Sequence, residues 1–411
     1  MPWMETCAVT ERARMVFEWM KGRLSKIELA ELFGVSRPTL DKWIDRHLRL
    51  GLDGLKDVSR APHHHPNQTP PAICQRVLAF KRLHRNWGPR KLRAALIWAD
   101  RLMPWPAGST IGDMLRRDGL SQRRKVRRRV PPYTEPFSEC REPNDVWCVD
   151  FKGHFRTGDG SRCDPLTLTD AASRYLLVCR VMKSTGLDAT QRVLEAAFKE
   201  YGLPRAIRSD NGSPFAGQGV LALTRLSLWW IKLGIKPERI APGSPQQNGR
   251  HERFHLTLKQ ETASPPMASL AAQQRRFDEF KREYNTQRPH EALGQQTPAS
   301  IYVPSPRSYR RPPKDADYPA GTVVRRVQNG GEFYWRSAAI FLSEALRGER
   351  IGLRQLSDRY WSVEFMHLQL GLLDDRLGCM VPRRHEAMVR TALERCCPSA
   401  RLQDSNAPKK M

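Results

Sequence analysis

Long apolar runs are absent from this sequence of 411 residues. A membrane-spanning helix needs roughly 18 to 20 apolar residues in succession, whereas the richest short run, from 226 to 235, is interrupted by Lys232. The N-terminus has no basic start followed by an apolar block, which is the pattern of a secretory signal. These absences predict a cytoplasmic protein with no membrane partner.

Cysteine pairs at metal-binding or redox spacing are also missing. The nine cysteines are scattered and include no C-x-x-C motif, which indicates reduced thiols and not a disulfide framework. The tract from His63 to His65 has no cysteine pair at zinc-finger spacing beside it, and three consecutive side chains cannot easily chelate one ion. The sequence therefore predicts no zinc site.

Acidic residues are scarce relative to basic ones. The chain has 69 Lys and Arg against 43 Asp and Glu, a formal net charge of +26, while its 40% of hydrophobic residues is enough to build packed cores. This balance predicts a folded protein with an anionic partner, either nucleic acid or an anionic membrane surface, and strongly salt-dependent binding. The length predicts about two to four domains.

The N-terminal segment KIELAELFGVSRPTLDKWIDRHLRLG has the pattern of a helix, a tight turn and a second helix. Gly34 lies at the turn, and Ser36 is a candidate N-cap of the second helix. The apolar positions that can form a small core between the helices are Ala30, Val35, Leu40, Trp43 and Ile44. Either a helix-turn-helix DNA-binding module or a generic helical hairpin fits this pattern.

In the DNA-binding interpretation, the open face of the second helix enters the major groove. The side chains expected on that face are Arg37, Thr39 and Lys42. After the proline-rich segment APHHHPNQTPP, a second helical stretch from about 73 to 120 predicts another small DNA-binding unit. It is followed by six basic residues in seven, suited to a phosphate backbone or to a solvated linker: Arg123, Arg124, Lys125, Arg127, Arg128 and Arg129.

The composition changes after Pro143. Three short β-rich runs precede an amphipathic helix that opens after Thr185, and short strands at 204–210 and 236–242 then alternate with helices at 218–233 and from about Gln247. This order predicts a mixed α/β sheet. A basic proline-rich linker follows Pro304, and alternating runs from 321 to 372 predict a small antiparallel β-barrel before a last helix and a polar tail.

The sequence therefore predicts a multidomain chain. The expected divisions are a helix-turn-helix domain at 1–60, a second helical DNA-binding domain with the basic linker at 67–130, an α/β catalytic core at 143–306, a small β-barrel at 318–375, and a helix with a polar tail at 376–411.

Three carboxylates stand at the edges of elements in the α/β region. Asp150 lies in the apolar strand WCVDF, where an uncompensated charge would be costly. Asp210 precedes Asn211-Gly212 at the rim of the sheet, where open α/β sheets hold their sites. Glu252 begins a helix. Taken singly, such an aspartate is more often a turn cap than a ligand.

Together, three clustered carboxylates repel one another unless cations lie between them. Two Mg²⁺ or Mn²⁺ ions about 4 Å apart match such hard oxygen ligands. One ion activates water or a DNA 3′-hydroxyl and the other stabilises the leaving oxygen, with Asp150 as the expected bridging ligand. On the helix, the 3.6-residue repeat predicts that Glu252, His255 and Lys259 share the substrate face, whereas Phe254, Leu258 and Glu261 point the other way.

Four segments together resemble the integrase-type catalytic core of bacterial insertion-sequence transposases. They are WCVDF, RSDNGSPF, SPQQNGRHERFHLTLKQE and YNTQRPHEALGQQTPASIY. The resemblance covers about 145–306 and, more loosely, the helix-turn-helix segment. It implies a ribonuclease H-like fold whose D-D-E residues match Asp150, Asp210 and Glu252. Asp170, in LTLTDAASRY, is a competing first acid, but it resembles a position of the family's second strand that is not a ligand.

The spacing departs from the retroviral pattern, because the 41 residues between Asp210 and Glu252 exceed the retroviral number, and the extra length fits the SLWWIKLG helix. By resemblance Asn211, Gly212 and the loop 244–249 flank the site, and Lys259 contacts the DNA backbone. Arg253 is either a phosphate contact or a solvated residue. Arg288 and His290 are structural or DNA-facing.

The resemblance implies a nucleoid-associated bacterial transposase that binds the terminal inverted repeats of its element as double-stranded DNA, nicks the ends and joins them to target DNA. Holding two ends together implies a homo-oligomer on DNA. Two rivals remain: a DNA-binding regulator with an inactive core, and a metal-dependent nuclease without strand transfer.

Overall fold

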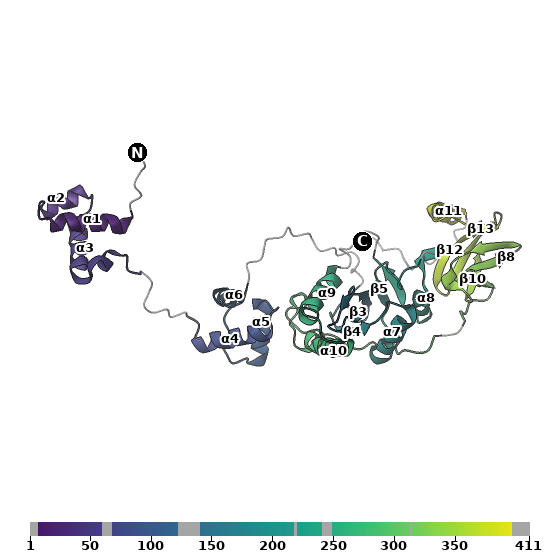
Figure 1. The fold of residues 1–411 in the computed structure, drawn as a ribbon. Coiled ribbons are helices and arrows are strands. Elements are labelled where there is room, and N and C mark those ends of the chain that lie inside the picture. Colours follow the sequence, from purple (N-terminus) through teal and green to yellow (C-terminus); the bar gives the residue numbers. More distant parts are fainter. Residues whose placement is uncertain are drawn as a thin grey trace. The chain divides into compact units, whose positions relative to one another are not determined.

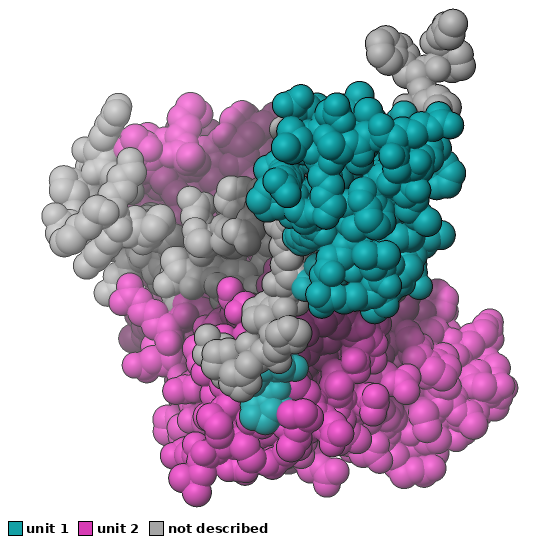
Figure 2. Space-filling view, turned by 90° about the vertical axis from the view of Figure 1, so that its left-hand side faces the viewer, with its two compact units in different colours: residues 1–70 teal, residues 71–411 magenta. Residues whose placement is uncertain are grey.

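The computed structural model describes residues 7–59, 68–121, 140–217, 220–240, 249–312 and 315–396. The chain divides into two compact units, residues 1–70 and 71–411, which Figure 2 draws in separate colours. The predicted basic run at 123–129 lies outside the described residues. Among the helices that are described, none combines the length and apolar character that crossing a bilayer requires.

The first unit is a small three-helix module. It consists of α1 (Ala8–Met20), α2 (Lys26–Leu32), α3 (Arg37–Leu50) and a 3-10 turn, η1 (Gly51–Leu55). Gly34 separates α2 from α3 with a positive φ of 62°, which glycine adopts without steric cost. Ser36 occupies the N-cap of α3, as predicted, although its side chain makes no capping hydrogen bond. The predicted core is confirmed: Ala30, Leu40, Trp43 and Ile44 are buried, and Val35 packs against them.

A second helical bundle begins the larger unit. Its helices are α4 (Pro71–Leu83), α5 (Pro89–Ala99) and α6 (Gly108–Arg117). Proline at the first position of α5 fits the helix start because its missing N–H has no intrahelical partner there. Trp87 and Trp105 are buried in the core between the helices.

The central domain is built on a mixed six-stranded sheet, as predicted. Its strands are β1 (Val146–Phe151), β2 (Phe155–Arg156), β3 (Arg162–Asp170), β4 (Leu176–Met182), β5 (Ala206–Ser209) and β6 (Lys236–Arg239). β1 and β4 flank β3 antiparallel, while β5 runs parallel to both β1 and β6. The C-terminal ends of β1, β5 and β6 therefore lie at the same edge of the sheet.

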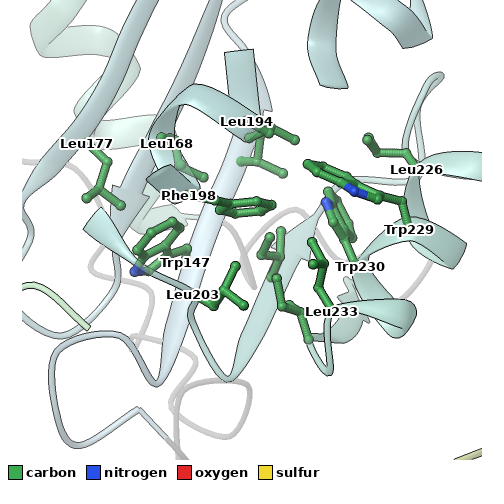
Figure 3. Packing of buried hydrophobic residues seen from close by; sticks show 14 of the residues in the cluster. Trp147, Leu168, Leu177, Leu194, Phe198, Leu203, Leu226, Trp229, Trp230 and Leu233 are labelled. Atoms are coloured by element: carbon green, nitrogen blue, oxygen red, sulfur yellow. The ribbon is translucent and has the colours of Figure 1, made fainter. Parts of the chain in front are cut away.

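Helices cover both faces of this sheet (Figure 1). On one face α7 (Leu187–Tyr201) and α8 (Arg225–Lys232) pack on the strands, and Phe198 lies between Trp147 and Trp229 (Figure 3). On the other face α9 (Gly249–Thr262) and α10 (Leu270–Thr286) pack against Cys163, Leu176 and Cys179. Successive strand residues point to opposite faces, so each strand contributes to both cores.

Helix α8 belongs to two hydrophobic cores. Leu226, Trp229 and Trp230 face the sheet, whereas Leu228 and Ile231 pack with the C-terminal β domain. The helix begins at Arg225 and not near 218 as predicted, because a capping box at Thr224 starts it and the preceding Leu221 and Ala222 have left-handed backbone angles.

The C-terminal domain is antiparallel β structure followed by a helix. It contains β7 (Val323–Arg326), β8 (Glu332–Trp335), β9 (Ala338–Phe341), β10 (Arg350–Gln355), β11 (Tyr360–Phe365), β12 (Leu368–Asp374), β13 (Cys379–Met380) and α11 (Arg383–Cys396). The pairing gives a five-stranded sheet in the order β13-β12-β11-β10-β7 and a separate β8-β9 ladder. Closure of these strands into a barrel stays a prediction.

Candidate functional site

Asp150 lies near the end of β1 on the face covered by α9. Trp147 and Val149 point to the α7/α8 core, so the alternation of the strand turns Asp150 to the opposite face. Its partner in the antiparallel register is Thr167 of β3. The side chain of Asp150 is 17% exposed, which leaves the carboxylate accessible at the rim of an otherwise apolar strand.

Asp210 follows β5 directly, at the same edge of the sheet as Asp150. The Asn211 side chain donates to the Ile240 carbonyl at 2.9 Å, which ties the segment after β5 to the end of β6. The Oδ1 atom of Asp210 is buried and has no hydrogen-bond partner among the described residues. A buried carboxylate oxygen without a donor is costly, and a cation would satisfy it.

Gly212 leaves room for that carboxylate. A Cβ atom at this position would lie 2.9 Å from Asp210 Oδ2, a distance that real Cβ atoms do not show. We expect Gly212→Ala to displace the Asp210 carboxylate and to lower the DNA cleavage that the sequence resemblance implies by about tenfold or more, because small misplacements of a reacting group have effects of this order. Steady-state cleavage rates measure this, with Gly186→Ala as the control. An unchanged rate would mean that the position of the Asp210 carboxylate is unimportant.

Helix α9 carries the third acid, Glu252, in its first turn. Glu252 and Lys259 are exposed and Phe254 and Leu258 are buried, as the helical repeat predicted. The prediction for His255 was wrong: it is 7% exposed and faces the sheet with His251, not the substrate side. Both imidazoles are buried because they contact β3.

A single hydroxyl links the two histidines to Asp150. Thr167 Oγ1 lies 2.9 Å from Nε2 of His251 and 2.9 Å from Nε2 of His255, and it donates to the Asp150 carbonyl at 3.1 Å. The hydroxyl has one proton, and the carbonyl oxygen can only accept it. Both imidazoles therefore donate from Nε2, and the His255 Nδ1 lone pair faces Asp150 Oδ2 at 3.8 Å.

Among the described residues, Asp150, His251 and His255 form the cluster of possible metal ligands whose donor atoms all lie within 4.8 Å of one another. Asp210 and Glu252 are not part of this cluster. The two Nε2 atoms are already bonded to the Thr167 hydroxyl, so they are not open to an ion in this arrangement. The cluster holds α9, and with it Glu252, against the strand that carries Asp150.

The buried histidines predict a loss of stability in acid. Burial lowers the pKa of His251 to about 3, and burial with the nearby charges of His251 and Lys152 lowers the pKa of His255 to about 2. The unfolded chain takes up these protons below about pH 6.5 and the folded chain does not, so stability falls as the pH drops from there toward the folded values. We expect about 1 kcal/mol lost per histidine per pH unit below 6.

Chemical denaturation at pH 7.5 and 5.5 measures this loss, and His255→Gln is the matched variant because the glutamine amide reaches the position of the imidazole Nε2 and can keep the hydrogen bond to Thr167 without titrating. We expect the variant to have a shallower pH dependence than the parent chain. Identical slopes for the two proteins would contradict the neutral, buried state of His255.

A small pocket lies beside α9 on the side of Lys259. It has a volume of about 100 Å³ and is lined by Lys152, His154, Phe155, Leu258 and Lys259, among others. Lys259 is exposed at this pocket, and its expected contact with the DNA backbone stays a prediction.

Asp170, the competing first acid, is fully buried and saturated with hydrogen bonds. Its carboxylate accepts from the backbone N–H groups of Asn144 and Ser173 and from the Ser173 hydroxyl. Burial raises its pKa. These contacts give Asp170 a structural role in joining β3 to the start of the domain, and they leave Asp150 as the better candidate.

The side chains predicted to bind DNA on α3 lie at its surface. Arg37 and Lys42 are exposed, and Arg37 lies 3.9 Å from Asp41. The Thr39 hydroxyl shares a hydrogen bond with Ser36 at 2.9 Å. The predicted basic run, Arg123 to Arg129, is outside the described residues. The role of each of these residues stays a prediction.

Arg288 and His290 could be either structural or DNA-facing on the sequence alone, and their contacts favour structural roles. Arg288 is 7% exposed and pairs with Glu261 at 3.2 Å. His290 packs edge-on against Tyr284, and burial first, then the charges of Lys91 and Arg288, lowers its pKa to about 3. Sequence reasoning missed two residues of this cluster, His251 and Thr167. Their only sequence signal is that His251 lies one helical turn before His255.

Comparison with known families places domain models along most of the chain. Models described as "Integrase core domain" match residues 141–245 and 233–298. A "Helix-turn-helix domain" model matches residues 11–63, and a "Homeodomain-like domain" model matches 39–115.

Similar proteins come from bacterial insertion elements. The uncharacterized 39.2 kDa protein of insertion element IS476 from Xanthomonas euvesicatoria is 29% identical over 60% of this chain and 70% of its own length. Transposase InsD of insertion element IS2D from Escherichia coli is 27% identical over 67% of this chain and 87% of its own. A chain of the simian T-cell lymphotropic virus intasome, solved with a PP2A regulatory subunit, has 16% identity and a TM-score of 0.34 over 71% of this chain and 91% of that one.

Proposed function

Because this chain belongs to the integrase-type transposases of bacterial insertion sequences, we propose that it cuts the ends of its element and joins their 3′-hydroxyls to target DNA. The proposed substrate is double-stranded DNA that carries the terminal inverted repeats. The helix-turn-helix domains supply DNA binding, and the proposed chemistry lies in the integrase core.

The observation that carries this proposal is the placement of two carboxylates at one edge of the sheet. Asp150 lies near the end of β1 and Asp210 follows the parallel β5, and the buried Oδ1 of Asp210 has no donor among the described residues. Glu252 lies on the exposed side of α9, and the histidine contacts with Thr167 hold this helix against β3, the neighbour of β1. These hard oxygen ligands suit Mg²⁺ or Mn²⁺.

We assign Asp150, Asp210 and Glu252 as the residues that hold divalent metal, with two ions as the proposed number. Such a cation, when bound, lowers the pKa of an attacking hydroxyl and stabilises charge on the leaving oxygen. The protein contributes the fixed position of the carboxylates. Thr167 and the two neutral histidines orient the Asp150 segment, and Gly212 leaves space for the Asp210 carboxylate.

Several finer points belong to the same proposal. Arg37, Thr39 and Lys42 contact the major groove, Lys259 contacts the backbone near the site, and the C-terminal strands close into a small barrel. The chain acts as a homo-oligomer because joining two element ends at one target requires them to be held together.

A joining assay tests the proposal. Pre-nicked duplexes that end in the inverted repeats flanking the gene are incubated with the full chain, supercoiled target DNA and Mg²⁺ or Mn²⁺. We expect covalent joining that EDTA abolishes. Cleavage of intact ends without joining would identify a metal-dependent nuclease, and sequence-specific binding with neither reaction would identify a DNA-binding regulator with an inactive core.

A further inference from the structure

The pocket of about 100 Å³ beside α9 has an apolar interior. It lies where α9 and α10 meet the segment that links β1 to β2. Phe155 of β2, Leu258 of α9 and Phe277 of α10 line it, and the last two are almost fully buried. The Thr262 hydroxyl, which also lies in the lining, already donates to the Leu258 carbonyl at 2.7 Å. The interior therefore favours an apolar ligand.

The solvent side of the same pocket is cationic. Lys152 follows the end of β1 and is partly exposed, and Lys259 lies on the exposed side of α9. Among the described residues that line the pocket, none is acidic. A ligand whose charged end remains at the surface therefore meets two positive charges and no negative one.

The size of the pocket limits what can enter it. Pockets for drug-sized molecules are roughly 300 to 1,000 Å³, whereas an enclosed apolar cavity of about 150 Å³ holds a benzene molecule. A volume of about 100 Å³ that is open on one side is therefore suited to a single ring whose polar substituent stays outside. The apolar interior and the cationic rim together select an aromatic ring that carries one negative charge.

We propose that this pocket binds a small aromatic carboxylate, with the ring inside the pocket and the carboxylate between Lys152 and Lys259. The binding itself is independent of the proposed function. Its consequence rests on that function, because Lys259 is the proposed contact for the DNA backbone and a carboxylate bound to it competes with a phosphate. The bound molecule therefore inhibits DNA joining.

A ligand titration tests the site directly. The full chain is titrated with 4-fluorobenzoate, followed by fluorine NMR, without DNA or divalent metal. We expect saturable binding with a Kd on the order of 1 mM, which is within the range open to so small a ligand. The uncharged 4-fluorobenzamide should bind about threefold or more weakly, the effect of losing an exposed ion pair. Thymidine, which offers an unpaired base without a carboxylate, should bind no more tightly than the amide.

Two kinds of variant locate the binding. Ala263→Leu fills the pocket directly after α9 and keeps both lysines, so we expect it to weaken binding by about tenfold or more through steric conflict. Ala99→Leu adds the same side chain at the exposed end of α5 and is the matched control. Lys152→Gln should weaken binding about threefold, and Lys152→Arg should retain the parental affinity.

Parental affinity in Ala263→Leu would overturn the site, as would equal affinities of the carboxylate and the amide for the parent chain. Tighter binding of thymidine would overturn the assigned class of ligand. Thermal unfolding controls for folding, and Ala263→Leu should unfold at or above the parental Tm because it fills existing space. If its Tm falls, the lysine variants decide, and equal affinities of the parent, Lys152→Gln and Lys152→Arg would overturn the site.

The joining assay tests the consequence. With DNA below saturation, 4-fluorobenzoate at ten times its Kd should slow joining by the parent chain about tenfold, and it should have little effect on Ala263→Leu relative to the uninhibited rate of that variant. Binding without inhibition would refute the competition with DNA. Joining by a chain that binds no 4-fluorobenzoate would refute this site alone, whereas binding by a chain that joins DNA under no condition would refute the proposed function alone.

Discussion

Asp150→Asn, Asp210→Asn and Glu252→Gln are each expected to lower metal-dependent DNA cleavage and joining by about three orders of magnitude, because a metal ion supplies several kcal/mol of transition-state stabilisation. Each substitution keeps the size of the side chain and removes its negative charge. Single-turnover assays on pre-nicked and intact duplexes measure the two steps separately.

DNA binding should persist in all three variants, because the helix-turn-helix domains lie elsewhere in the chain. Asp188→Asn is the control: Asp188 is an exposed carboxylate in the first turn of α7 and should be dispensable. Normal cleavage in Asp150→Asn or Asp210→Asn would contradict the assignment of that residue as a metal ligand. An effect confined to Glu252→Gln would mean that two other residues hold the metal with Glu252.

Ending the chain at residue 312 is expected to make the catalytic domain insoluble or strongly destabilised. The truncation removes the C-terminal β domain and exposes the side of α8 that carries Leu228 and Ile231, both buried in the full chain. Each such side chain contributes roughly 1.5 to 3 kcal/mol when buried. The truncation also removes Glu349, the partner of Lys232 at 2.7 Å.

A reciprocal pair of variants isolates α8 as the cause. Leu228→Lys with Ile231→Lys should restore solubility to the truncated chain, because the lysines then face water. In the full chain the same two changes place charges in a core and should cost more than about 4 kcal/mol. Light scattering and thermal unfolding measure both effects. A soluble, monomeric truncated chain with the parental α8 would contradict the shared-core role of this helix.

The sequence contained enough information for the positions of the three acids along their elements. Apolar strand residues and the turn at Asn211-Gly212 placed Asp150 and Asp210 at the ends of two strands. Their adjacency depends on the parallel pairing of β1 with β5, which local sequence does not encode. That pairing was available only through the resemblance to a known core.

His255 shows where helical periodicity is insufficient. Each residue turns the helix by about 100°, so His255 lies about 60° from exposed Glu252 and about 60° from buried Leu258. Spacing alone does not decide between the two faces. Thr167 and Thr169 on β3 decide it, since their hydroxyls bond the imidazoles of His251 and His255.

The packing of α8 in two hydrophobic cores could not be predicted from the sequence either. It is apolar on all sides, which is typical of a buried helix, but the second domain that covers it, through Leu228 and Ile231, lies more than 80 residues later in the sequence.

Anomalous diffraction from crystals grown with Mn²⁺ is the most direct test of the central claim, that Asp150, Asp210 and Glu252 hold divalent metal. We expect a Mn²⁺ peak roughly 2 Å from carboxylate oxygens of both Asp150 and Asp210, with Glu252 completing the site when DNA is bound. A peak held by Asp150 with the imidazoles of His251 and His255, and without Asp210 or Glu252, would contradict it.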